Sequence, residues 1–228
     1  MASLNRVLIS NRGEVAIRIA KAASALGLES VGVYPPADSL SLHTRFTTEA
    51  REIGQPGGGA NDALRAYLDA ETLVQTAKLS GCDSVHPGYG FLSEDADFAA
   101  LCADEGLTFV GPPPAALSLF GDKLRARQLA QSLEIPVVPG SAQVLKSATE
   151  AEELARDLGY PVMLKAAGGG GGRGMRVVEG SEGMAEAFDR CRSEAEAAHV
   201  GRVIATSRVL VLVECAIILR SRRSSRAT

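Results

Sequence analysis

The stretch MLKAAGGGGGRGMRVVEG, Met163 to Gly180, places a run of glycines between two segments that are each typical of a β-strand. A dinucleotide-binding fingerprint needs a helix after its glycines, and a Walker phosphate loop needs Lys followed by Ser or Thr. Here the strand-like MRVV follows the glycines, and Arg173 stands where the Walker lysine would be. The stretch therefore predicts a β-hairpin with a glycine-rich tip.

A tip of this composition favours a phosphate ligand. Glycine has no Cβ, so its backbone N–H groups can approach phosphate oxygens closely. Strand alternation places Lys165 on the face opposite Val162 and Leu164, so its ammonium can point into a cleft while they pack in a core. The hairpin is thus expected to close over a nucleotide. The alternative is a linker with a surface lysine, which accounts for most glycine runs but not for the residues that flank this one.

Length and composition indicate a globular chain. The 228 residues allow one large domain, or one domain with a smaller one. Hydrophobic residues make up 46% and charged residues 22%, which excludes wholesale disorder. The net charge of -3 gives no overall argument for nucleic acid as a partner.

The cysteines and the apolar segments indicate the cellular compartment in which the protein is expected. Four cysteines lie far apart without a C-x-x-C pair, namely Cys82, Cys102, Cys191 and Cys215. They indicate neither a zinc site nor a disulfide framework, and we expect reduced, mostly buried thiols. The start of the chain lacks a secretory signal, and the longest apolar run carries Glu214 and is too short for a membrane span. A cytoplasmic protein without membrane contact is expected.

The first half of the chain alternates strand and helix patterns. Short apolar segments are expected as strands at 6–10, 29–34, 49–54, 83–86 and 107–110. Helices are expected at 14–26, at 70–79 with Asp69 as its cap, and after Ser93, which we predict as the cap of a helix with an acidic first turn. This alternation predicts βαβ units, and hence an α/β fold with a parallel sheet covered on both faces.

The pattern changes after two proline-containing breaks, Pro112 to Pro114 and Pro136 to Gly140. Helices are expected at 116–120, 123–133, 149–158 and 181–198, and the hairpin strands at 162–166 and 175–179. Two antiparallel strands with helices on one side suggest a small α+β unit, and we predict a domain boundary near residue 136.

Three further segments have a functional and a structural interpretation. HPGYGFLSE, residues 86–94, follows the carboxyl end of a parallel strand, where ligand crevices lie, although the residues alone favour a tight turn that packs Tyr89 and Phe91. NRGE, residues 11–14, has too few glycines to cradle a pyrophosphate and is explained by helix initiation. Lys123 is either a phosphate contact or a solvated helix residue.

Five motifs together resemble one family. ISNRGEVAIRI, HPGYGFLSE, GDK, PVVPG and YPVMLKAAGGGGGRGMRVV occur in the order and spacing of the biotin carboxylase family, the ATP-grasp component of biotin-dependent carboxylases. The resemblance covers residues 4 to about 198. It implies a Rossmann-like pre-ATP-grasp domain over 1–113, a helical linker over 114–135 and an ATP-grasp lid over 136–198.

The resemblance also implies an activity and its partners. Family members form carboxyphosphate from bicarbonate and MgATP, and then carboxylate the ureido nitrogen of biotin held on a carrier domain. A biotin carboxyl carrier domain and a carboxyltransferase component would be the partners, and family members are often homodimers.

The residues implied by the resemblance fall into two groups. Those expected to bind ATP are Lys123 and Lys165 on the phosphates, Gly170, Gly171 and Gly172 through backbone N–H, and Met175 at the adenine. Those of a possible active-site loop are His86, Gly88, Tyr89 and Glu94.

The end of the chain departs from the family pattern. In the family, the Mg²⁺-binding carboxylates, the bicarbonate-binding arginine and the general base lie in a third domain after the lid. Residues 199–228 contain no lysine or aspartate and a single glutamate, so we expect a disordered or frame-shifted tail, with no catalytic residue and no metal ligand in this chain. Two function classes stay open: the N-terminal part of a carboxylase that is inactive alone, and a non-catalytic nucleotide-binding or interaction remnant. The basic end of the tail makes nucleic acid a further, weaker option.

Overall fold

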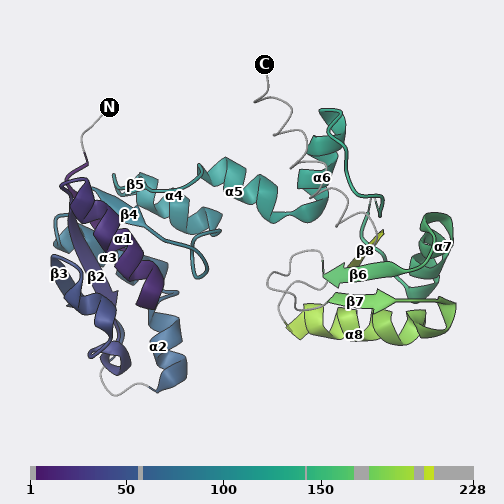
Figure 1. Cartoon of the computed structure of the whole chain (residues 1–228), viewed down its shortest axis with the longest axis horizontal. Helices are drawn as coiled ribbons and strands as arrows, with labels where there is room; N and C mark the ends of the chain where they lie inside the picture. Colours follow the sequence, from purple (N-terminus) through teal and green to yellow (C-terminus); the bar gives the residue numbers. More distant parts are fainter. Residues whose placement is uncertain (1–3, 56–58, 142, 167–174, 198–202, 208–228) are drawn as a thin grey trace, which may run out of the picture. The chain divides into compact units, whose positions relative to one another are not determined.

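The chain divides into two compact units, which are separated between Ser118 and Leu119 (Figure 1). The computed structural model describes residues 4–55, 59–141, 143–166, 175–197 and 203–207. Helix α5 (Pro114–Gly121) runs across the division.

The N-terminal unit is built on a five-stranded parallel sheet of order β3-β2-β1-β4-β5. Its strands are β1 (Arg6–Ile9), β2 (Glu29–Tyr34), β3 (Glu49–Glu52), β4 (Ser84–His86) and β5 (Thr108–Phe109). This confirms the α/β fold class and all five expected strands. The strand order reverses between β1 and β4, which is the point where open parallel sheets bind ligands.

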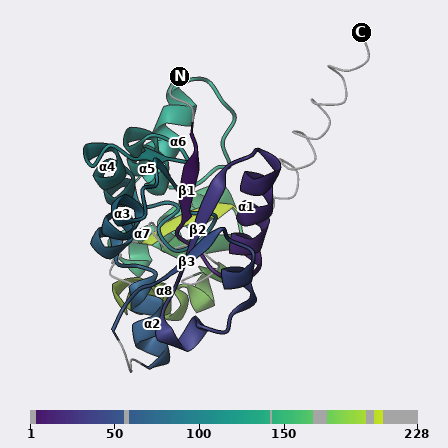
Figure 2. The same ribbon diagram turned by 90° about the vertical axis from the view of Figure 1, so that its left-hand side faces the viewer.

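Helices cover the two faces of this sheet unequally. Helix α1 (Gly13–Ala25) lies on one side of β1 and β2, while α3 (Ala70–Leu79) and α4 (Ala96–Asp104) lie on the other (Figure 2). The core on the α3 and α4 side is the larger one and includes Leu8 and Val85 from the sheet. The core beneath α1 is a small cluster of Ile9, Ala16 and Ala20.

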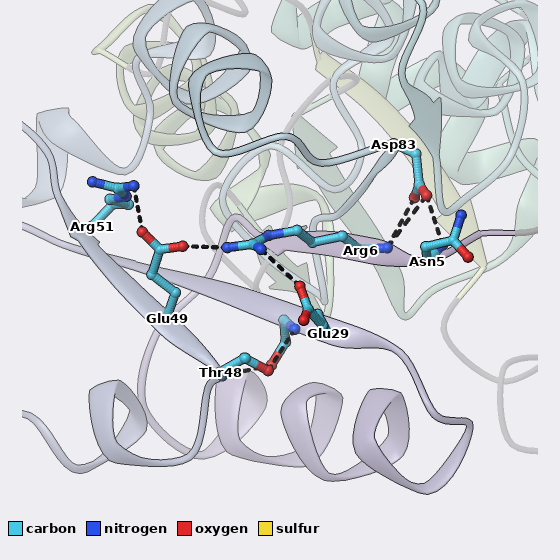
Figure 3. A network of polar contacts seen from close by, with 8 residues as sticks. Asn5, Arg6, Glu29, Thr48, Glu49, Arg51 and Asp83 are labelled. Atoms are coloured by element: carbon cyan, nitrogen blue, oxygen red, sulfur yellow. Dashed lines mark hydrogen bonds and ion pairs between the residues drawn. The ribbon is translucent and has the colours of Figure 1, made fainter.

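A charged network joins the amino-terminal ends of the strands (Figure 3). Arg6 donates from Nη1 to Oε2 of Glu29 at 2.7 Å and also forms an ion pair with Glu49. The carboxylate of Asp83, just before β4, accepts from the backbone N–H of Asn5 at 2.6 Å. Because these residues come from the starts of four different strands, the network fixes this edge and leaves the opposite, carboxyl edge to the connecting loops.

The helix expected after Ser93 begins later. Asp95 is the N-cap of α4, and its Oδ1 accepts from the backbone N–H of Phe98 at 2.8 Å. Residues 91–94 form turns instead, with Phe91 at a φ of 45°. The prediction of Ser93 as the cap was therefore wrong by two residues.

Two further elements of the N-terminal unit were not expected. Helix α2 (Ala60–Ala66) precedes α3, and its N-cap Gly59 donates its backbone N–H to Oδ2 of Asp62 at 3.0 Å. Short 3₁₀ turns, η1 (Pro36–Asp38) and η2 (Leu42–Arg45), lie between β2 and β3.

The second unit is a small α+β layer structure. Its elements are α6 (Lys123–Ser132), α7 (Ala148–Leu158), β6 (Val162–Ala166), β7 (Met175–Val178), η3 (Ser181–Gly183), α8 (Met184–Ala197) and β8 (Val203–Ser207). Strands β6 and β7 pair antiparallel, which confirms the hairpin. Helices α7 and α8 pack on one face of the hairpin, where Val162, Leu164 and Phe188 are buried. No helix in the described ranges is long and apolar enough to cross a membrane.

Strand β8 lies within the stretch expected to be a tail without a fold. It pairs antiparallel with β6, with Leu164 opposite Ala205, and so extends the hairpin to a three-stranded sheet of order β7-β6-β8. Residues 203–207 therefore differ from the expectation, because a β-branched segment can complete the open edge of β6. Residues 208–228 lie outside the described part of the chain.

The cysteines within the described residues are free and buried, as expected: Cys82, Cys102 and Cys191. Burial raises the pKa of the Cys82 thiol, and likewise that of Cys102, to about 11. Both are therefore protonated and unreactive at neutral pH.

Candidate functional site

The outer face of the hairpin brings two predicted nucleotide contacts together. Lys165 of β6 lies directly opposite Met175 of β7, and Met163 lies opposite Val177 one step along the ladder. Residues that face each other across an antiparallel pair point to the same side of the sheet. Lys165 therefore lies on the face away from the core, which confirms its predicted orientation.

This face combines an apolar wall with a cation. Met175 is 38% exposed and Val177 is 40% exposed, and the half-buried Lys165 lies beside them. On the opposite face, Arg176 forms an ion pair with Glu194 of α8. Within the part of the chain that the structure describes, no such ion pair engages Lys165. An apolar wall next to a lysine suits a ligand with a flat ring and an anionic group.

The glycine loop joins the strands at the Lys165 end of the hairpin. The connection runs from Ala166 to Met175. Gly170, Gly171 and Gly172, predicted to contact phosphates, lie outside the described residues. What the strand pairing establishes is that this connection starts and ends beside the Lys165 and Met175 pair.

Lys123 is the first residue of α6, a different element of the same unit. Asp122 caps this helix, because its Oδ1 accepts from the backbone N–H groups of Leu124 at 2.9 Å and Arg125 at 3.2 Å. Arg127 donates from Nη1 to the carbonyl of Val138 and so fastens α6 to the PVVPG loop. Lys123 is half-buried and engaged within the protein, which makes it more than a freely solvated side chain.

In the N-terminal unit, the loop after β4 is held by a buried asparagine that follows β1. Asn11 is 2% exposed, and its Nδ2 donates to the carbonyls of Pro87 at 2.7 Å and Tyr89 at 2.9 Å. Its Oδ1 accepts from the backbone N–H of Arg12 at 2.8 Å. These three hydrogen bonds satisfy the buried side-chain amide of Asn11. The NRGE segment therefore does more than start a helix. Through Asn11 it also fixes the shape of the HPGYG loop, at the point of the sheet where the strand order reverses.

Gly88 occupies a position that only glycine fits. Its φ is +67°, and a Cβ built there would lie 2.6 Å from Cγ1 of Val15 and 2.8 Å from Nδ2 of Asn11. Both contacts are closer than atoms can approach. The loop therefore passes over the start of α1 only because residue 88 has no side chain.

His86 and Tyr89 differ in how they are presented. Nδ1 of His86 accepts from the backbone N–H of Gly88 at 3.0 Å, and burial lowers the pKa of this imidazole, so the neutral ring is favoured. Tyr89 is 70% exposed, whereas Phe91 packs against Tyr67 with ring centroids 5.3 Å apart. The tight-turn interpretation therefore holds for Phe91 only. Glu94 is exposed in the turn before α4.

A charged and aromatic cluster beside this loop escaped the sequence reasoning. The Arg12 guanidinium lies 5.6 Å from the ring centroid of Tyr67 and 5.8 Å from that of Phe91. It also contacts Asp38 at 3.4 Å, and Asp38 accepts from the Tyr67 hydroxyl at 2.9 Å. Burial, with the Asp38 hydrogen bond, raises the pKa of Tyr67 well above its usual range. Since these residues are far apart in the chain, their only local signal was a polar pair, Asn11 and Arg12, straight after a buried strand.

Metal ligands do not gather in the described part of the chain. No group of three or more His, Cys, Asp or Glu side chains there could hold a metal ion.

Comparison with known proteins gives the family. The model of the biotin carboxylase N-terminal domain matches residues 3–117, half of the chain. The chain belongs to the biotin carboxylase family. The model of the ATP-binding domain of the carbamoyl-phosphate synthase large chain matches residues 122–212.

Curated relatives of this biotin carboxylase family member are much longer than the chain. The biotin carboxylase of Nostoc sp. is 41% identical over 194 residues, which cover 85% of this chain and 42% of the relative. The pyruvate carboxylase of Staphylococcus aureus is 43% identical over 196 residues, which cover 86% of this chain and 17% of the relative. The chain thus spans less than half the length of either protein.

Solved biotin carboxylases share the fold. The biotin carboxylase domain dimer of Hydrogenobacter thermophilus 2-oxoglutarate carboxylase, in complex with MgADP, ADP and bicarbonate, has a TM-score of 0.85 and 38% identity, covering 92% of this chain and 45% of its own. The beta-gamma-ATP complex of Campylobacter jejuni biotin carboxylase has a TM-score of 0.85 and 36% identity, covering 91% of this chain and 46% of its own.

Proposed function

We propose that this chain supplies the N-terminal domain and the ATP-grasp lid of a biotin carboxylase. Such an enzyme forms carboxyphosphate from bicarbonate and ATP and then carboxylates biotin on a carrier domain. The observation that carries the proposal is the cross-strand pair of Lys165 and Met175 beside a glycine connection, in a chain that belongs to this family. A biotin carboxyl carrier domain and a carboxyltransferase component would be its partners.

In this proposal the lid binds ATP through chemically distinct parts. The apolar side of Met175 and Val177 would take the adenine ring, and Lys165 would place its ammonium near the phosphates, where a compact point charge is effective. Gly170, Gly171 and Gly172 would donate backbone N–H groups to phosphate oxygens, a common way to bind such anions. Lys123 would be a second cation on the phosphates. Phosphoryl transfer depends mainly on such positioning and on charge stabilisation.

The loop at the sheet edge would face the reacting groups. Tyr89 presents an exposed ring and Glu94 an exposed carboxylate, on a loop anchored by Asn11 and by the absence of a side chain at Gly88. We assign His86 a structural part in this loop, because its Nδ1 already accepts from Gly88. The exposed pair, Tyr89 and Glu94, is the part of the loop proposed to meet substrate.

The ligands of a Mg²⁺ ion are proposed to lie mainly outside the described residues. Bicarbonate-dependent ATP cleavage in the family uses Mg²⁺, but no carboxylate cluster of sufficient size lies in the described ranges. The metal ligands would therefore come from other residues, and the 228-residue polypeptide alone is proposed to be catalytically inactive. The same observation favours a second candidate function, a nucleotide-binding module without turnover.

Nucleotide binding tests the proposed lid directly. ATP titrated into the 228-residue chain by calorimetry should bind weakly, with a dissociation constant above about 1 μM, because one wall of the site is missing. Lys165→Met should weaken this binding about tenfold, since it removes a charge-assisted hydrogen bond. Lys146→Met, at an exposed lysine before α7, is the matched control and should change nothing. Equal binding by all three proteins would contradict the lid assignment.

A further inference from the structure

Arg12 is the centre of a cluster to which the proposed function assigns no part. Its guanidinium lies over two aromatic rings, 5.6 Å from the ring centroid of Tyr67 and 5.8 Å from that of Phe91. Its Nη1 also lies 3.4 Å from Oδ2 of Asp38. These three partners belong to different segments, namely η1 after β2, the end of α2 and the loop after β4. One side chain that follows β1 therefore connects three other parts of the N-terminal unit.

Tyr67 is the fixed member of this cluster. Its side chain is completely buried in the core beneath α3 and α4, and its hydroxyl donates to Oδ2 of Asp38 at 2.9 Å. Phe91 packs on this ring, with centroids 5.3 Å apart and planes inclined by 36°. Phe91 is only half-buried and also lies beneath the guanidinium of Arg12. Tyr67 thus gives the loop after β4 a rigid surface, and Arg12 contacts both rings of the pair.

Phe91 needs these contacts because its backbone conformation is unfavourable. Its φ of 45° lies in the left-handed region, which a bulky residue rarely adopts and keeps only where its surroundings hold it. The preceding residue, Gly90, has a φ of +70° and open space where a Cβ would lie, so it sets no steric limit of its own. If Phe91 were released, the loop could turn at Gly90.

Tyr89 lies between two anchors of this loop. On its N-terminal side, Asn11 donates to the carbonyls of Pro87 and of Tyr89 itself. On its C-terminal side, beyond Gly90, the loop is held by Phe91 in the cluster. Because the Tyr89 ring is 70% exposed, its position depends on these anchors more than on contacts of its own.

We propose that Arg12 is a positioning residue for the HPGYG loop, and that its cation holds Phe91 on Tyr67 and so fixes where Tyr89 is presented. The rings are the contacts that matter, because a half-exposed ion pair such as that with Asp38 contributes little. A guanidinium over two rings gains from two cation–π contacts. The consequence for catalysis rests on the proposed function, in which Tyr89 meets substrate, whereas the effect on the loop does not.

Amide exchange in the 228-residue chain tests the loop without any ligand. Three backbone amides report its opening because they donate hydrogen bonds within it: those of Gly88, Ser93 and Asp95. Arg12→Met removes the cation but keeps a long side chain. It should speed the exchange of these amides about tenfold, since two cation–π contacts are lost together. The amides of β1 and β2 should keep their exchange rates.

Three single variants separate the possible causes. Arg12→Lys keeps a cation within reach of the rings and should restore slow exchange. Asp38→Asn removes the ion pair but keeps an acceptor for the Tyr67 hydroxyl, and should change exchange by no more than about twofold. Arg65→Met, at an exposed arginine of α2, is the matched control and should change nothing.

A double variant tests whether Arg12 acts through Phe91. Phe91→Leu removes the ring from the loop side and should speed exchange of the same amides, even if Arg12→Met fails to fold. Adding Arg12→Met to Phe91→Leu should give no further increase, as expected for two residues that share one contact. Circular dichroism of each variant shows whether the N-terminal unit is folded.

The catalytic consequence is measured in a chimera that joins residues 1–198 to the part of Bacillus subtilis biotin carboxylase 1 beyond its matched region. Arg12→Met should raise the KM for bicarbonate or for free biotin about tenfold, which Arg12→Lys should reverse. The KM for ATP should not change, because the lid is proposed to bind the nucleotide. A silent chimera would count against the proposed function, while the exchange rates still decide whether Arg12 holds the loop.

Three results would overturn the assignment of Arg12. The first is loop exchange in folded Arg12→Met that equals that of the original chain. The second is equal acceleration by Asp38→Asn and Arg12→Met, which would assign the effect to the ion pair. The third is an active chimera in which Arg12→Met leaves the KM values for bicarbonate and biotin unchanged.

Discussion

Single residues at the sheet edge show how closely the loop after β4 is fitted to the start of α1. Gly88 combines a left-handed backbone with the absence of space for a Cβ, while Gly90 has φ +70° and open space around it. Alanine substitutions at these two glycines therefore distinguish the cost of a left-handed backbone, which both share, from the cost of a steric clash, which only Gly88 adds.

We expect Gly88→Ala to destabilise the N-terminal unit by about 2 to 4 kcal/mol, the sum of a left-handed backbone and an overpacked contact. Gly90→Ala should cost only about 1 kcal/mol, because the backbone term acts alone. Urea unfolding followed by circular dichroism measures both. If the two variants lost the same free energy of unfolding, the loop would be able to move away from Val15 and Asn11 at little cost in stability.

Sequence reasoning succeeded at the residue scale where local periodicity decides. Alternation along a strand was enough to place Lys165 opposite to Val162 and Leu164, and burial bears this out. The Arg12, Asp38 and Tyr67 cluster could not be predicted, because it depends on loops that only the tertiary fold brings together.

At the scale of elements, helix α4 shows why a cap is hard to assign from sequence. Ser93, Glu94 and Asp95 all suit a helix N-terminus, and a serine before acidic residues is a good candidate for the cap. The turns at 91–94, with a positive φ at Phe91, delay the helix until Ala96. The side chain that meets the first free N–H groups is then that of Asp95.

This difference gives a test with two variants. Asp95→Ala should lower the free energy of unfolding of the N-terminal unit by about 1 kcal/mol, because an N-cap acceptor is lost. Ser93→Ala should change it by less than about 0.5 kcal/mol, as expected for a surface substitution. Thermal unfolding of the two proteins distinguishes them, and the reverse order of stabilities would restore Ser93 as the cap.

Helix α2 and strand β8 were not predicted from the sequence, for two different reasons. Helix α2 is short and begins at a glycine cap, so it lacks both the length and the side-chain cap that helix prediction needs. Strand β8 lies in a segment whose composition departs from the preceding chain, and its pairing with β6 is a long-range contact that no local pattern reveals.

For the whole molecule, the class of fold followed from the alternation of strands and helices, but the strand order did not. The order β3-β2-β1-β4-β5 is set by which crossovers pass in front of the sheet and which pass behind it. That order decides that the loops after β1 and β4 are neighbours, and hence that Asn11 can hold the HPGYG loop.

We propose that this chain is the N-terminal part of a biotin carboxylase and that the remaining catalytic groups come from residues outside it. The most direct measurement is phosphate release from ATP by a chimera that joins residues 1–198 to the part of Bacillus subtilis biotin carboxylase 1 beyond its matched region. We predict release that depends on both bicarbonate and free biotin, and none above background from the 228-residue chain alone, since several transition-state groups would be absent together. A folded chimera that stays silent while the intact relative is active, or turnover by the 228-residue chain itself, would contradict the account.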